Sequence, residues 1–195
     1  MICDDGKHRS ELEMYCAHLL GLWPGKTVPV FLVHTTEPKD VSVWEEAEQE
    51  LLVAEGRRQL DEQQKQLEQV RGRAQFLFTT CLGLAAVSVA GRSTVFAAAS
   101  DSSATIWSIG LLMTALGALG AGAIVVGKKS VGAIDAALLT TVEQPVLPKL
   151  AAGYSRAIRT GENTVATSVT AFRDAAFLVF LGAVCWGVAW LTATV

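Results

Sequence analysis

The chain has 195 residues, of which 51% are hydrophobic and 18% charged, and its mean hydropathy is +0.36. Soluble domains carry about 25% charged residues, so this composition excludes a single soluble globular domain, a disordered chain and a disulfide-rich secreted module. Residues 1–73 hold 9 Lys and Arg against 14 Asp and Glu, whereas residues 74–195 hold 7 against 5. This distribution indicates a small membrane protein with an acidic, water-soluble N-terminal part.

Residues 1–42 predict a short helix and an extended segment. Ser10 is a candidate cap for a helix over Glu11–Leu20, and Gly21 would end that helix. Val28–Thr35 is rich in β-branched and aromatic residues, which favours a strand. A single strand cannot form a sheet, so we expect it to pair with another copy or to lie on helices.

Residues 43–73 are strongly helix-forming, with Ser42 as a candidate N-cap and acidic residues in the first turn. We expect this long helix to continue into the first membrane span. Its apolar residues recur every seven positions, at Val53, Leu60, Leu67 and Ala74. This narrow coiled-coil seam needs a partner helix from the same chain or another subunit, and Leu60 and Leu67 are the candidate oligomerisation residues.

Three stretches without a charged residue are about long enough to cross a bilayer, which takes about 20 apolar residues. They are residues 74–91, 104–127 and 175–195, joined by a short loop over 92–103 and a longer region over 128–174. The alternative is a set of buried helices in a soluble protein. In the longer region we expect helices over 131–143 and 148–158, the second with Pro148 in its first turn, and a third helix that Asn163 caps and that runs into the last span.

Lys and Arg flank the spans asymmetrically, with 11 on one side and only Arg92 on the other. The positive-inside rule then places the N-terminus and residues 128–174 in the cytoplasm and the C-terminus outside, in the cell inner membrane. No cleavable signal precedes the first span. We expect no disulfide, because Cys3 and Cys16 would lie in reducing cytosol.

Candidate sites are few. Gly117 and Ala121 form a small-residue pair for close helix contact within or between subunits. We expect no bound metal or cofactor, because the spacings of the N-terminal Cys and His residues (Cys3, His8, Cys16, His18 and His34) do not match the usual zinc-ligand pairs. No catalytic set is visible, which predicts a non-enzymatic protein.

The cytoplasmic basic residues Lys149, Arg156 and Arg159 are the candidate ligand-binding residues. They suit either contact with anionic lipid or a nucleotide-phosphate site, since Arg provides forked donors.

A Gln- and charge-rich helix (RRQLDEQQKQLEQVRGR) runs into a first span (AQFLFTTCLGLAAVSVAG), followed by a short loop and a second span. Over residues 43–129 this layout resembles the small prokaryotic SLATT-type membrane proteins, which occur beside nucleotide second-messenger enzymes in phage-defence loci. It is also similar to the membrane subunit of the Hailong defence system, an oligonucleotide-controlled channel. The resemblance implies an oligomeric effector and a cytosolic nucleotide-synthesising partner, and no functional residue is carried over from it.

The sequence therefore predicts an all-α membrane protein with three transmembrane helices and a long cytoplasmic helix leading into the first. The expected function is an oligomeric, pore-like effector gated by a cytoplasmic nucleotide or oligonucleotide. The alternative is a non-conducting membrane scaffold that binds a partner through its cytoplasmic helix.

Overall fold

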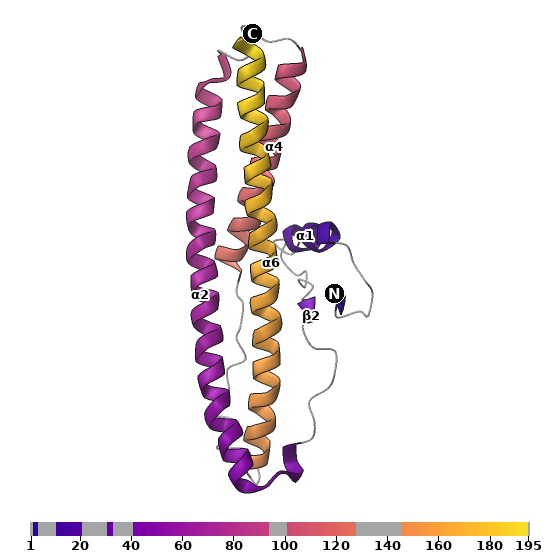
Figure 1. The fold of residues 1–195 in the computed structure, drawn as a ribbon, viewed down its shortest axis with the longest axis vertical. Helices are drawn as coiled ribbons and strands as arrows, with labels where there is room; N and C mark the ends of the chain where they lie inside the picture. The colour runs from indigo at the N-terminus through magenta and orange to yellow at the C-terminus, as the bar shows by residue number, and fades with distance from the viewer. Residues whose placement is uncertain are drawn as a thin grey trace. The chain divides into compact units, whose positions relative to one another are not determined.

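The computed structural model describes residues 2–3, 11–20, 31–32, 41–93, 101–127 and 146–194. Its elements in chain order are β1 (Ile2–Cys3), α1 (Glu11–Leu20), β2 (Phe31–Leu32), the 3-10 helix η1 (Val41–Val43), α2 (Glu46–Ala90), α4 (Asp101–Val126) and α6 (Val146–Thr194) (Figure 1). The helices α2, α4 and α6 are each long and apolar enough to cross a membrane. Apart from the two-residue strands and their pairing, every described element is helical, which confirms the predicted all-α class.

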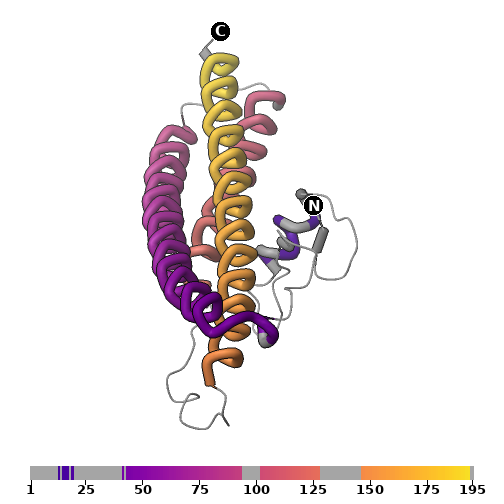
Figure 2. Tube along the Cα trace, turned by 60° about the horizontal axis from the view of Figure 1, so that its bottom comes forward, coloured from indigo at the N-terminus to yellow at the C-terminus, as the bar shows by residue number. Residues whose placement is uncertain are grey.

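The predicted continuity between the polar helix and the first apolar span is confirmed. α2 is a single helix of 45 residues that covers both (Figure 2). Its start differs from the prediction, because Ser42 lies within η1 and is not the N-cap. Instead, the backbone N–H of Glu45 donates to Glu48 Oε2 at 3.2 Å. A side chain that reaches back over three residues satisfies one of the free N–H groups at a helix start, as in a capping box.

α6 replaces the two separate helices that were predicted at 148–158 and from Asn163 onward. It runs without a break for 49 residues, with Pro148 in its first turn as predicted, so Asn163 is an interior residue and not a cap. Hydroxyls that follow Asn163 bond back within the helix, as Thr167 Oγ1 does to the Asn163 carbonyl at 2.7 Å. Gly161 costs about 1 kcal/mol inside a helix, which the packing described below offsets.

The predicted helix over Glu11–Leu20 is confirmed as α1. β2 lies within the predicted extended segment, and its pairing differs from both predicted alternatives. It forms an antiparallel pair with β1 of the same chain, with Ile2 opposite Leu32 and Cys3 opposite Phe31. The expectation that this strand must pair with another copy or lie on helices overlooked a partner strand within the same chain. Ser10 and the predicted helix over 131–143 lie outside the described residues.

The chain divides into two compact units, which we name by composition. The polar unit comprises Met1–Ser10, Pro29–Gln69 and Lys128–Ser168, and the apolar unit comprises Glu11–Val28, Val70–Gly127 and Val169–Val195. α2 and α6 each contribute one part to both units. The two units are described separately below.

In the polar unit, α2 packs on α6 through a seam with alternating three- and four-residue spacing. Val53 is buried together with Ala151 and Tyr154 of α6, and Leu60 packs against this cluster. A Cβ built on Gly56 would lie 3.0 Å from the Tyr154 ring, so the absence of a side chain at this glycine makes room for the tyrosine. The predicted seven-residue pattern thus has its partner helix within the same chain.

In the apolar unit, α4 and α6 approach each other at glycines. A Cβ at Gly110 would lie 2.9 Å from the Gly182 carbonyl, and one at Gly182 would lie 2.8 Å from the Gly110 carbonyl. In the same contact between α4 and α6, Trp186 Nε1 donates a hydrogen bond to the Trp107 carbonyl at 3.2 Å. α2 joins the unit through Val70, which is buried with other α2, α4 and α6 side chains. Contacts between backbones this close leave no space for side chains at the contact points.

α6 carries a seven-residue repeat of mostly small residues that was not noticed in the sequence. All six of its members are buried: Tyr154, Gly161, Ser168, Ala175, Gly182 and Ala189. A seven-residue repeat keeps one stripe of a helix facing its neighbours over a long distance. The same stripe of α6 therefore makes the helix contacts in each unit.

Candidate functional site

The three candidate ligand-binding cations lie on the first third of α6. Lys149 and Arg156 are exposed and Arg159 is partly buried. Residues seven or three positions apart share a helix face, and the three span about 15 Å at 1.5 Å per residue. The structure therefore brings them onto one side of one helix.

A fourth cation contacts the same part of α6 but lies on another side of it. Arg57 of α2 donates from Nε to the hydroxyl of Tyr154 at 3.1 Å. Arg156 follows Tyr154 by two residues, which is about 200° around a helix of 3.6 residues per turn. Arg57 therefore supports the α2–α6 contact and does not extend the basic face.

The proposed oligomerisation residues take part in helix contacts within one chain. Leu67 is 6% exposed, Leu60 is partly buried, and Ala121 is fully buried. A Cβ on Gly117 would lie 2.5 Å from Val179 Cγ2, so this glycine serves the contact of α4 with α6. For Gly117 and Ala121, contact within one subunit was one of the two predicted alternatives. Association of copies through these four residues stays a prediction, and it would have to displace the packing described here.

The apolar part of α2 has an exposed face with polar and small residues. Gln75, Thr79 and Gly83 recur at four-residue spacing and are all exposed, and nothing lies within 4 Å of a Cβ built on Gly83. The Thr79 hydroxyl donates to the Phe76 carbonyl at 2.8 Å. Such a hydrogen bond to the helix's own backbone still leaves the hydroxyl oxygen able to accept another hydrogen bond.

Polar groups are also buried in the polar unit. Gln63 is 7% exposed, and its Nε2 donates to the Ile158 carbonyl at 3.0 Å. Among the described residues, its Oε1 is one of two buried side-chain polar atoms without a hydrogen-bond partner. A buried amide with one unsatisfied atom costs free energy, so this position is a weak point of an otherwise well-packed seam.

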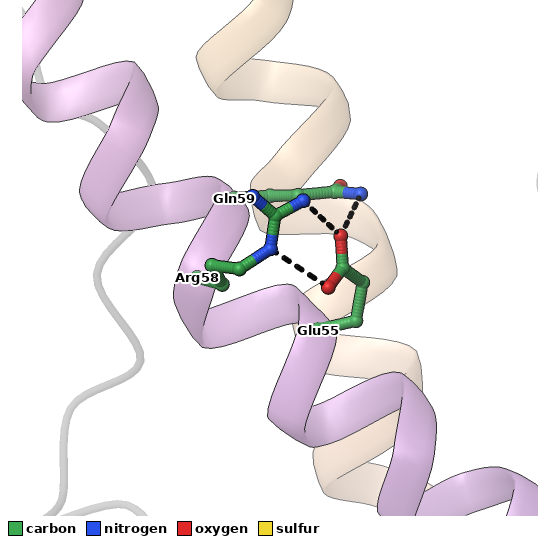
Figure 3. A network of polar contacts seen from close by, with 3 residues as sticks. All are labelled: Glu55, Arg58 and Gln59. Carbon is green, nitrogen blue, oxygen red and sulfur yellow. Dashed lines mark hydrogen bonds and ion pairs between the residues drawn. The ribbon is translucent and has the colours of Figure 1, made fainter.

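The exposed side of the polar part of α2 holds a small network. Glu55 accepts hydrogen bonds from Arg58 Nε at 2.9 Å and from Gln59 Nε2 at 3.1 Å (Figure 3). These hydrogen bonds, the one from Arg58 first, lower the pKa of Glu55 to about 2. Both charged side chains are solvent-exposed, so the pair stabilises one helical turn and adds little to overall stability.

Tyr15 of α1 is a contact that sequence reasoning missed. It is 6% exposed, and its hydroxyl donates to the Leu116 carbonyl of α4 at 3.0 Å. The tyrosine occupies the space over Gly120, where a side chain would collide with its hydroxyl. Burial, followed by the charge of Asp174, raises the pKa of Tyr15, so the hydroxyl stays protonated as a donor.

The residues considered for a metal are only partly described by the structure. Cys16 is exposed on α1 and Cys3 lies in β1, while His8 and His34 are outside the described residues. Within the described ranges, no three His, Cys, Asp or Glu side chains are grouped as metal ligands would be. Cys81 and Cys185 are free thiols in the apolar unit.

Comparison with known proteins adds no relative, since no family model, no curated protein and no solved structure matches this chain. The functional conclusions therefore depend on the fold, the exposed face of α2 and the basic face of α6.

Proposed function

We propose that the chain is a multi-pass protein of the cell inner membrane that assembles into a pore-like oligomer under control of a cytoplasmic nucleotide or oligonucleotide. The observation that carries the proposal is the exposed face of Gln75, Thr79 and Gly83 on the first span. An amide and hydroxyls are costly against lipid, and they become favourable when they face water or a polar partner. Several copies that turn this face toward a common axis would enclose a water-filled path across the membrane.

The contacts inside one chain support an assembly of several copies. In the described part of the apolar unit, the three helices contact one another mainly through apolar and small residues, such as Val70, Ala74 and Ile124. A packed core of this kind has no space for a column of water. The path must therefore lie between subunits, on the side where α2 is exposed.

Channel recording on purified, reconstituted protein tests this proposal. The variant Gln75→Leu plus Thr79→Val removes the polar groups at nearly constant shape, and we expect it to reduce single-channel conductance several-fold. Ser108→Ala is the matched control, because it removes an exposed hydroxyl that bonds to its own helix on α4. Equal conductance in wild type and double variant would refute a pore lined by α2.

The controlling ligand is proposed to bind Lys149, Arg156 and Arg159, and a cytosolic nucleotide-synthesising enzyme would supply it. These cations suit phosphate groups, because guanidinium groups form paired hydrogen bonds that persist when long-range attraction is screened. We expect Arg156→Ala plus Arg159→Ala to abolish binding of cyclic nucleotides and short oligonucleotides to the solubilised protein at moderate salt. Arg58→Ala is the control with another exposed arginine. Equal binding by the wild type and the double variant would show that Arg156 and Arg159 do not bind the ligand.

The proposed orientation places the N-terminus and residues 128–174 in the cytoplasm and the C-terminus outside. The asymmetry of 11 basic residues to one supports it. A reporter enzyme fused after Val195 should be active only outside the cytoplasm. Reporter activity in the cytoplasm would refute the three-span arrangement.

The second candidate is a membrane scaffold that does not conduct. Apolar side chains exposed around the start of α2 favour it, with Val43 82% exposed and Leu51 71% exposed. Exposed apolar groups on a polar segment are typical of a protein-binding surface. Absence of any current in the presence of every nucleotide tested would favour this candidate over the pore.

A further inference from the structure

Among the described side chains of α1, Tyr15 makes the contact with α4. Tyr15 lies over Gly120 and bonds to the carbonyl of Leu116, so both of its partners belong to α4. On the other side of α1, Glu13 and Cys16 are exposed. These contacts fix the level along α4 at which α1 lies.

That level is inside the apolar length of α4. Gly127 directly follows the last residue of α4, and its carbonyl accepts a hydrogen bond from Arg71 at 3.0 Å. This charged contact marks the boundary between the apolar length of α4 and the polar region beyond it. Gly120 and Leu116 come 7 and 11 residues before Gly127, or about 10 and 16 Å along a helix. A headgroup layer is roughly 5–8 Å thick on each side of the hydrocarbon core. The Tyr15 hydroxyl therefore lies at or below the inner edge of that layer.

The charges on α6 place the same boundary from the other direction. Arg173 and Asp174 form an ion pair at 3.1 Å, and no charged residue follows them up to Val195. The apolar part of α6 therefore begins directly after Asp174, whose charge also contributes to the raised pKa of Tyr15.

We infer that α1 is an interfacial membrane helix, fastened by Tyr15 to α4, whose exposed face contacts the headgroups of the bilayer. Figure 1 shows α1 running across the direction of α4 and α6, as a helix lying in the membrane plane would. Interfacial helices are buried about 5–10 Å into the boundary between headgroups and acyl chains, which matches the depth derived above. The sequence alone placed residues 1–42 in the cytoplasm. This inference depends on the apolar helices crossing a bilayer, and it is independent of the pore and of the nucleotide.

The exposed thiol of Cys16 provides a probe at the required position. In a full-length variant with Cys3, Cys81 and Cys185 changed to alanine, a nitroxide label on Cys16 is measured in vesicles of phosphatidylcholine with a minor share of phosphatidylglycerol. We expect its accessibility to a water-soluble nickel chelate, relative to oxygen, to be several-fold lower than that of a label at the exposed polar position Gln64→Cys. Equal ratios at the two positions would place α1 in water and overturn the inference.

The anchor is tested in the same labelled protein. Gly120→Leu fills the space of the tyrosine, so α1 should detach and the Cys16 label should become several-fold more accessible to the nickel chelate. Gly187→Leu is the control, because this glycine is exposed on α6 and nothing lies within 4 Å of a Cβ there. If the accessibility of the Cys16 label to the nickel chelate is unchanged in Gly120→Leu, Tyr15 does not hold α1 in place.

Discussion

Replacing Gly182 by alanine should force α6 away from α4, whereas the same change at Gly187 should not. A Cβ at Gly182 would lie 2.8 Å from the Gly110 carbonyl oxygen and would also collide with the hydroxyl of Thr114. Because ordinary contacts need about 3.5 Å, the two helices would have to separate locally by about 0.7 Å. Nothing lies within 4 Å of a Cβ at Gly187, which is exposed on the same helix.

The comparison isolates the cost of the collision. Both substitutions remove a glycine from a helix interior and gain about 1 kcal/mol from helix propensity, so this gain cancels between them. Overpacking a well-packed contact costs about 1–3 kcal/mol. Gly182→Ala should therefore have a free energy of unfolding about 1–3 kcal/mol below that of Gly187→Ala, or an unfolding equilibrium constant about 5- to 160-fold larger.

Reversible unfolding in mixed micelles, with increasing dodecyl sulfate and helicity followed by circular dichroism, measures this difference. Gly187→Ala should match or exceed the wild type. Equal free energies of unfolding for the two variants would refute the close approach of α4 and α6 at Gly110 and Gly182.

Two further predictions concern the polar unit. Gln63→Leu should raise the free energy of unfolding by about 1–2 kcal/mol in the same assay, because it removes a buried unsatisfied amide oxygen at similar volume; a loss of stability would mean that the amide is needed. The side-chain carboxyl of Glu55 should titrate near pH 2 by NMR, below its ordinary value of 4.5, and Arg58→Ala should move the midpoint back toward that value. Since the folded pKa is the lower one, the stabilisation from this pair is present above pH 4.5 and is lost as the pH falls toward 2; the same midpoint in both proteins would contradict the hydrogen bonds.

Much of the fold could be predicted because it depends on local composition. The apolar lengths identified the three helices that are long enough to cross a membrane, and the absence of helix breakers identified α2 as one helix. The prediction that Asn163 caps the start of a helix was wrong. Residues that cap helices also occur inside them, where neighbouring Ser and Thr hydroxyls bond back to the preceding turn. Local composition cannot separate these two cases.

The contacts between elements were harder to predict for two different reasons. Leu60 and Leu67 were recognised as a seam, but a periodic stripe does not identify its partner, which proves to be α6 of the same chain. Tyr15 was missed because one aromatic residue in a ten-residue helix creates no periodic pattern. The repeat on α6 is visible as a spacing of seven in the sequence, and a search for small residues at that spacing would have found it.

The repeat on α6 limits how this helix can move. A slide along its axis by less than one repeat would bring larger neighbours, such as Phe172 or Val179, to levels now occupied by Ser168, Ala175 or Gly182. One full repeat is about 10 Å, further than small rearrangements of packed helices reach, which are about 1–2 Å. Piston motion of α6 is therefore sterically blocked, and a signal that travels along it must be carried by rotation or tilting about the line of small residues.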